Sequence, residues 1–139
     1  MGKRQQRQEL IAELITKEHI ANQTELAARL NANGIECTQA TVSRDIMDMC
    51  LSKDASGFYV SSEIARLRRV AADVVLSVQA AGNLVVIKTR AAGADSMADA
   101  LDKAPIDGVL GTIAGDDTIF LAAQTPEAAL SIQDYLLSC

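Results

Sequence analysis

The order of apolar patterns over residues 72–139 constrains the fold of this chain more than any other feature. Two strand-like runs, roughly residues 73–80 and 83–89, are joined by Gly82 and Asn83, a pair that favours a hairpin turn. A helical pattern, a second hairpin and a final helix follow over residues 93–103, 108–123 and 125–137. The order ββαββα predicts an α+β domain of two layers, with one sheet against two helices.

Residues 1–61 show helical spacing instead. Apolar residues recur at helical intervals between residues 4 and 17, which predicts a first helix. Asn22 as an N-cap and Gly34 as a stop bound a second helix, and Thr38 caps a third within "QATVSRDIMDMCL". The stretch "KDASGFYV" then indicates a tight hairpin. Three helices and a hairpin predict a winged helix-turn-helix.

The third helix has an unusual outward face. Val42, Ile46 and Met49 form its inward stripe. An outward helix face kept only for solubility tends to carry Lys and Glu, but this one carries Arg, Gln and Ser, which suit the major groove of double-stranded DNA. The alternative is a three-helix domain that packs on something else. The outward residues are Ala40, Ser43, Arg44 and Met47, with Gln39 at the edge.

Charge divides the chain in the same place as the apolar patterns. Residues 1–70 carry 10 Lys and Arg against 9 Asp and Glu, whereas residues 71–139 carry 3 against 9. The overall net charge of −5 therefore comes from the second half, and it does not exclude nucleic-acid binding by the first. We expect a DNA-binding domain over residues 1–61, a linker over 62–71 and a second domain over 72–139.

Aspartates gather in the second domain. Asp116 and Asp117 are adjacent at the bend of the second hairpin, and Asp95, Asp99 and Asp102 are spaced to share one helix face. If these groups converge, a cationic ligand is the natural complement, and a guanidinium binds carboxylates with a planar fork. The alternative is that Gly115 and Asp116 are ordinary turn residues.

The second domain is near the lower size limit for an independent core, yet its strands and first helix are rich in Ala, Val and Ile. Association of several copies would bury the excess apolar surface. We therefore expect a homo-oligomer held together by this domain.

Other classes of protein are disfavoured. No apolar stretch approaches a membrane span and the N-terminus lacks the apolar centre of a secretory signal, so we expect a cytoplasmic protein. Cys37, Cys50 and Cys139 have neither zinc-ligand nor redox-motif spacing. No nucleophile with an adjacent base is present and the single histidine, His19, falls in the first half, so we do not expect an enzyme or a metal site.

Two motifs carry a resemblance that covers nearly the whole chain. They are "TQATVSRDI", residues 38–46, and "GTIAGDDTI", residues 111–119, with "LD" at 101–102 upstream. In this order and spacing the chain resembles the bacterial arginine repressors. The resemblance implies an N-terminal winged helix-turn-helix and a C-terminal domain that forms trimers, two of which stack into a hexamer. In that family L-arginine binds between the trimers as co-repressor and favours the operator-binding state.

The resemblance also implies roles for individual residues. Ser43 and Arg44 match the recognition-helix positions that contact operator DNA, with Gln39 and Thr41 beside them. Asp116 and Asp117 match the aspartate pair that holds the cationic groups of L-arginine, and Asp102 matches a helix aspartate in the same pocket. The candidate arginine-binding set is Asp95, Asp102, Ala114, Asp116 and Asp117.

The chain departs from the family pattern in three places. Many members have Pro-Gly before the ligand-site helix, where this chain has Ala91 and Ala92, with Gly93 one place later, so the helix start is expected to shift. Asp95 falls where relatives often carry Gln, Asn or His. The wing is shorter and less basic than usual.

The function that the resemblance implies is arginine-dependent repression of arginine biosynthesis, with activation of catabolism. The alternative is an architectural accessory protein for DNA recombination.

Overall fold

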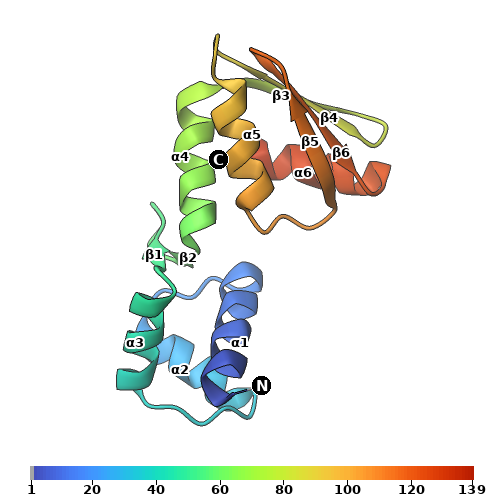
Figure 1. Ribbon diagram of the computed structural model, residues 1–139. Coiled ribbons are helices and arrows are strands. Elements are labelled where there is room, and N and C mark those ends of the chain that lie inside the picture. Colours follow the sequence, from blue (N-terminus) through green and yellow to red (C-terminus); the bar gives the residue numbers. More distant parts are fainter. Residues whose placement is uncertain (1) are drawn as a thin grey trace. The chain divides into compact units, whose positions relative to one another are not determined.

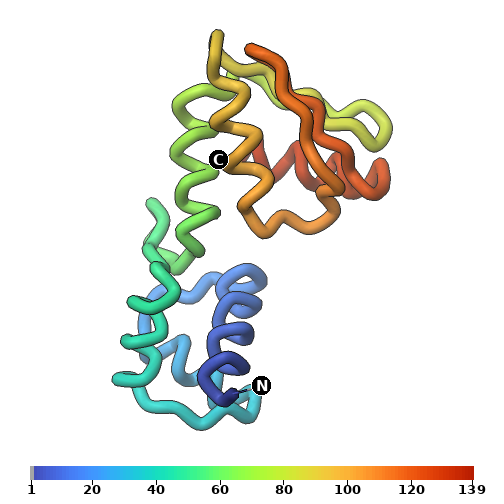
Figure 2. The backbone as a smooth tube through the Cα atoms, viewed as in Figure 1, coloured from blue at the N-terminus to red at the C-terminus, as the bar shows by residue number. Residues whose placement is uncertain are grey.

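The computed structural model describes residues 2–139, which form two compact units divided between residues 65 and 66 (Figures 1 and 2). Each unit has its own cluster of buried apolar side chains. The two units are therefore described one at a time.

The first unit is a three-helix domain with a small hairpin, as predicted. Helix α1 packs on α2, α2 packs on α3, and the hairpin strands pair antiparallel. Its core combines residues from all three helices with Ile20 and Tyr59. The elements are α1 (Lys3–Lys17), α2 (Gln23–Ala32), α3 (Gln39–Asp48), β1 (Ser52–Lys53) and β2 (Tyr59–Val60).

Local capping fixes where α2 and α3 begin. The Asn22 side chain accepts a hydrogen bond from the backbone N–H of Glu25 at 2.8 Å, and the Glu25 carboxylate accepts one from the N–H of Ala21 at 3.2 Å. Thr38 caps α3 by accepting from the N–H of Thr41 at 3.3 Å. These side chains satisfy N–H groups that have no partner within the helix, so both helix starts follow from the sequence.

The second unit is an antiparallel sheet with helices on one face (Figure 1). The strand order is β3-β4-β6-β5, α6 packs on β3 and β4, and α5 packs on β5. Alternate residues of the two central strands, Val85, Ile87, Ile119 and Leu121, are buried under the helices. The elements are β3 (Val75–Ala81), β4 (Leu84–Thr89), α5 (Ala94–Lys103), β5 (Val109–Ala114), β6 (Thr118–Ala123) and α6 (Pro126–Leu137).

The structure differs from the expected linker over residues 62–71, because these residues belong to helix α4 (Ser62–Val74). Leu67, Ala71 and Val74 lie at helical spacing and are buried in the core of the second unit. That burial makes α4 part of the core of the second unit, and the first strand begins at Val75 instead of residue 73. The charged run at residues 66–69 concealed this stripe.

None of the helices within residues 2–139 is long and apolar enough to cross a membrane.

Candidate functional site

The outward face of α3 carries the predicted DNA-contacting side chains. Gln39 and Arg44 are exposed, and Thr41 and Ser43 are half-buried. Val42 and Ile46 are buried on the opposite side, as the spacing predicts. Met47, on the same outward face, is 76% exposed. A shallow cleft of about 400 Å³ runs along this face, lined by Ala40, Ser43, Arg44, Met47 and Asp48.

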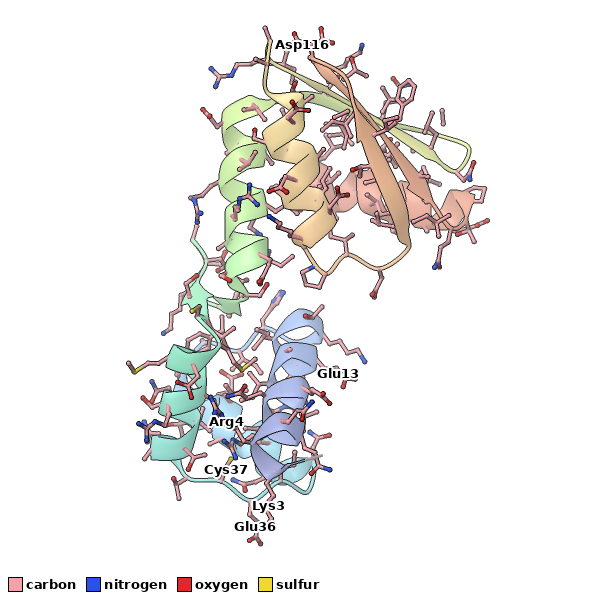
Figure 3. All side chains as sticks on the ribbon, viewed as in Figure 1. Lys3, Arg4, Glu13, Glu36, Cys37 and Asp116 are labelled. Carbon is pink, nitrogen blue, oxygen red and sulfur yellow. The ribbon has the colours of Figure 1, made fainter. Side chains whose placement is uncertain are left out.

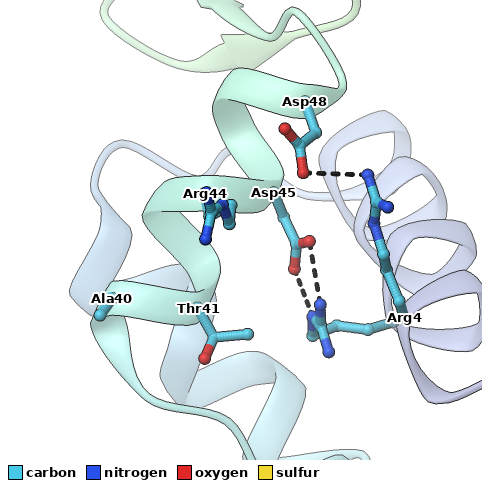
Figure 4. Close-up of a pocket in the computed structure, with 7 residues that line it drawn as sticks. Arg4, Ala40, Thr41, Arg44, Asp45 and Asp48 are labelled. Carbon is cyan, nitrogen blue, oxygen red and sulfur yellow. Dashed lines mark hydrogen bonds and ion pairs between the residues drawn. The ribbon is translucent and has the colours of Figure 1, made fainter.

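A second cleft, of about 620 Å³, includes side chains of α1 as well as α3 (Figure 4). Arg4 donates a hydrogen bond to Asp48 at 3.0 Å, and Arg7 forms an ion pair with Asp45. Within residues 2–139, Arg44 is the arginine of this cleft that forms no ion pair. Its guanidinium is therefore the one in the cleft free to donate to a base or phosphate. The lining residues are Arg4, Arg7, Ala40, Thr41, Arg44, Asp45 and Asp48.

Asp45 and its partners are not among the site residues predicted from the sequence. Asp45 is 1% exposed. Burial raises the pKa of its carboxyl, but hydrogen bonds from Arg7 and Gln8 outweigh burial and bring this pKa below its ordinary value. The hydrogen bond to Asp45 likewise raises the pKa of Arg7. A signal was present, because Asp45 falls beside Ile46 on the inward side of the helix, where a lone carboxylate requires a partner.

The wing is short but ordered by its own side chains. The Asp54 carboxylate accepts hydrogen bonds from the N–H groups of Ser56 and Phe58, both at 3.0 Å. The Tyr59 N–H donates to the carbonyl of Ile20 at 2.9 Å, which ties the wing to the loop before α2. Lys53 is the one basic residue in the hairpin, and its ammonium lies 5.3 Å from the centre of the Tyr59 ring.

In the second unit, Asp116 and Asp117 lie in the β5–β6 turn and both are exposed; Figure 3 labels Asp116. Their backbone carbonyls hold the turn in place: that of Asp117 accepts from the N–H of Thr89 at 2.8 Å, and that of Asp116 accepts from the N–H of Ala94 at 3.4 Å. The turn is thus fastened to the start of α5. This places Asp95, in the first turn of α5, on the element that the Asp116 backbone contacts.

Asp102 lies further along the same helix. It is seven residues beyond Asp95, or about 10 Å along the helix axis. Its carboxylate accepts a hydrogen bond from the hydroxyl of Thr112 on β5 at 2.7 Å, and Ala114, half-buried, ends that strand. The acidic residues therefore follow α5 and the adjoining end of β5.

Asp99 is set apart from the other acidic residues of α5. Its carboxylate forms ion pairs with Arg66 at 2.8 Å and with Lys103 at 3.2 Å. The hydrogen bond from Arg66, followed by that from Lys103, lowers its pKa. Across residues 2–139, the carboxylates of Asp95, Asp102, Asp116 and Asp117 form no ion pair.

The three-helix unit, its wing and the polar face of α3 define a winged helix-turn-helix, the fold of DNA-binding regulators. Residues 2–59 match the arginine repressor DNA-binding domain and residues 71–138 match the arginine repressor C-terminal domain. The chain therefore belongs to the arginine repressor family, as its motifs indicated, and its members are DNA-binding transcriptional regulators rather than enzymes.

Full-length relatives agree with the domain matches. The arginine repressor of Heliobacterium modesticaldum is 43% identical over 140 residues, which cover 92% of this chain and 93% of the relative. That of Thermus thermophilus is 39% identical, covering 96% of this chain and 88% of the relative. That of Thermotoga maritima is 38% identical, covering 97% and 96%.

Proposed function

We propose that this chain is an L-arginine-dependent regulator in which bound arginine promotes operator binding. The observation that carries the proposal is the difference between Asp99 and its neighbours. Asp99 forms ion pairs with Arg66 and Lys103, whereas the carboxylates of the other four members of this acidic set form no ion pair within residues 2–139. Those four, together with Ala114, are the proposed arginine site: Asp95, Asp102, Asp116 and Asp117.

Electrostatics explains why such a site would favour arginine. Two carboxylates about 5 Å apart repel by roughly 3 kcal/mol at an effective dielectric near 20. A guanidinium binds carboxylates in a bidentate manner, and the α-amino group supplies a second cation. Asp95 lies in the first turn of α5, which the backbone of Asp116 in the β5–β6 turn contacts. One ligand could therefore neutralise charges on both the helix and the turn.

The proposed DNA contacts are made by α3. Arg44 reads a guanine, Gln39 reads an adenine, and the hydroxyls of Thr41 and Ser43 bind phosphate or base edges. Exposure of Arg44 and the absence of an ion pair on it among residues 2–139 support this assignment.

The proposed assembly is a trimer, two of which form a hexamer. Its support is the sheet face that the helices leave uncovered. Ile113 and Phe120 are cross-strand partners on this face and are 71% and 47% exposed, with Val86 next to Phe120 on β4. Contiguous apolar surface of this kind is typical of protein interfaces. The arginine sites would lie at the junction between trimers.

In this mechanism arginine acts through a difference in affinity. If it bridges carboxylates of two trimers, it stabilises the hexamer over the separate trimers and shifts the population accordingly. The hexamer would present DNA-binding units to paired half-sites of double-stranded operators. We propose that these operators control arginine biosynthesis, with activation of catabolic genes as a second role, and that the protein acts in the cytoplasm.

Calorimetric titration tests the ligand assignment. L-arginine should release heat with the wild-type chain and little or none with Asp117→Asn. Asp107→Asn is the matched control, because Asp107 is also exposed but lies outside the proposed site. Light scattering and operator gel shifts with and without arginine then test assembly and DNA binding. Equal arginine binding by wild type and Asp117→Asn would refute the site.

A further inference from the structure

Asp45 stands out among the side chains of the recognition helix. Within residues 2–139 the buried polar or charged residues are Asp45 and Thr89, and Asp45 directly follows Arg44 on α3. Burying a carboxylate is costly unless its oxygens are paired. Its environment therefore requires a compensating structure.

That structure is a three-bond clamp from α1. The Arg7 guanidinium contacts both carboxylate oxygens, with Nε donating to Oδ2 and Nη2 donating to Oδ1 at 3.0 Å. The Gln8 amide donates a further hydrogen bond to Oδ1 at 3.0 Å. The Arg7 side chain is itself only 15% exposed. We call this arrangement of Arg7, Gln8 and Asp45 the α1–α3 clamp.

The clamp fixes the rotation of α3 about its axis, which the apolar contacts of this helix do not. Val42 and Ile46 hold α3 against the core by burial, which is non-directional and tolerates a small rotation of the helix. A bidentate guanidinium–carboxylate pair has fixed planar geometry and does not tolerate it. Because successive residues are 100° apart around a helix, fixing Asp45 also fixes the direction of Arg44.

We propose that Arg7 and Gln8 are positioning residues for DNA recognition, which hold α3 at the rotation that directs its outward side chains toward base edges. The inference rests on the proposed role of α3 in reading DNA. A contact to a base edge must be placed to within a fraction of an ångström, so a loosened clamp would lower sequence discrimination before it lowers non-specific attraction to phosphates.

The same two helices offer a matched control. Arg4 and Asp48 also pair between α1 and α3, but through one hydrogen bond at 3.0 Å, with side chains that are 67% and 35% exposed. An exposed single contact restrains a helix weakly. Arg7→Lys and Arg4→Lys both keep the positive charge and remove the planar guanidinium. They differ only in the ion pair that is altered, Arg7–Asp45 or Arg4–Asp48.

The test is a competition assay with two duplexes. One is selected by the wild-type chain from a random-sequence library, and the other is a shuffled duplex of the same length and composition. The readout is the ratio of the two affinities, measured at one salt concentration, for Arg7→Lys, Gln8→Met, Arg4→Lys and Arg44→Ala. Circular dichroism checks that each variant is folded.

We expect Arg7→Lys to lower the ratio by about tenfold while changing affinity for the shuffled duplex by less than about twofold. Gln8→Met should lower the ratio by about threefold, because one hydrogen bond of three is lost. Arg4→Lys should leave it within about twofold of wild type. A purely structural role for Arg7 would lower thermal stability and leave the ratio of the folded protein unchanged.

A folded Arg7→Lys chain with the wild-type ratio would overturn the clamp. If Arg7→Lys does not fold, Gln8→Met decides, and an unchanged ratio again overturns it. The affinity ratio of Arg44→Ala tests the proposed function separately. An unchanged ratio refutes a base contact by Arg44, whatever the results for the clamp variants. A wild-type chain that enriches no sequence would overturn both.

Discussion

Gly34 and Cys50 occupy equivalent positions in the same helix-ending motif. Each lies one residue beyond a C-cap and has a positive φ, 85° for Gly34 and 54° for Cys50. After α2, the N–H of Ile35 donates to the carbonyl of Leu30 and that of Gly34 to Asn31; after α3, Leu51 donates to Ile46 and Cys50 to Met47. This is the Schellman arrangement, in which glycine is the favoured residue.

Cys50→Gly should therefore stabilise the first unit. A residue with a Cβ in the left-handed region is strained by about 1 to 2 kcal/mol, and glycine removes this strain. Glycine also makes the unfolded chain more flexible, which offsets about 0.5 to 1 kcal/mol of the gain. We expect a gain of about 0.5 to 1 kcal/mol and a rise of a few degrees in Tm. Gly34→Ala should shift Tm downward in the same thermal melts. An unchanged or lower Tm for Cys50→Gly would contradict this reasoning.

Ala92, before the proposed arginine site, poses the same problem. Its φ is 62°, whereas Gly93 is the N-cap of α5 with an ordinary φ of −92°. The departure from the family's Pro-Gly thus leaves the left-handed position to an alanine, and α5 begins at Ala94, one residue later than predicted. Ala92→Gly should stabilise the second unit by about 0.5 to 1 kcal/mol, measured by chemical denaturation. Ala91→Gly, where φ is not positive, should destabilise it instead.

Gly93 is needed for space rather than for φ. A Cβ on this residue would lie 2.9 Å from Cβ of Val74 and 3.0 Å from the carbonyl oxygen of Arg90. We expect Gly93→Ala to cost about 1 to 3 kcal/mol, because the neighbouring backbone must shift. A neutral Gly93→Ala in the same denaturation series would show that α4 and α5 can separate at this point without penalty.

The α1–α3 clamp predicts a pH dependence of stability. The pKa of Asp45 is lower in the folded chain than its unfolded value near 4, since the hydrogen bonds from Arg7 and Gln8 outweigh burial. The stabilisation is then fully present above about pH 4 and is lost as the pH falls through the folded pKa. Asp45→Asn should cost about 2 to 3 kcal/mol at pH 7, and much less near pH 2.

Urea unfolding at several pH values measures this difference. Asp48→Asn is the control, because it alters an exposed pair and should cost less than about 0.5 kcal/mol throughout. A cost for Asp45→Asn that stays constant down to pH 2 would show that the carboxylate charge is not what stabilises the clamp.

Much of the fold could be predicted from the sequence because its signals are local. Asn22, Thr38 and Gly34 define helix ends through hydrogen bonds within a few residues. Helix α4 was not predicted because arginines interrupt its buried stripe of Leu67, Ala71 and Val74. The stripe can be recognised only when the core of the second unit, in which these residues are buried, is known.

The candidate sites also combine features with local sequence signals and features that depend on contacts between distant elements. The outward face of α3 and the Asp116–Asp117 turn follow from spacing and turn chemistry. The partners of the carboxylates do not: Arg7 is 38 residues before Asp45, and the pairing of Asp99 with Arg66 depends on α4 being a helix. Ion pairs between distant elements have no periodic pattern, so only the structure separates Asp99 from the carboxylates proposed to bind ligand.

The uncovered sheet face gives a test of assembly. Phe120 lies between Val86 on β4 and Ile113 on β5, and all three point away from the helices. Phe120→Lys should leave the fold intact, because the side chain is not in the core, and should weaken self-association by about 10- to 100-fold through the lost apolar burial. Light scattering over a concentration series measures this, with Met47→Lys as the control, because Met47 is also an exposed apolar residue but lies in the other unit. If the Phe120→Lys chain keeps the mass of the wild-type assembly at all concentrations, subunits associate through another surface, and the proposed junction for arginine must be sought there.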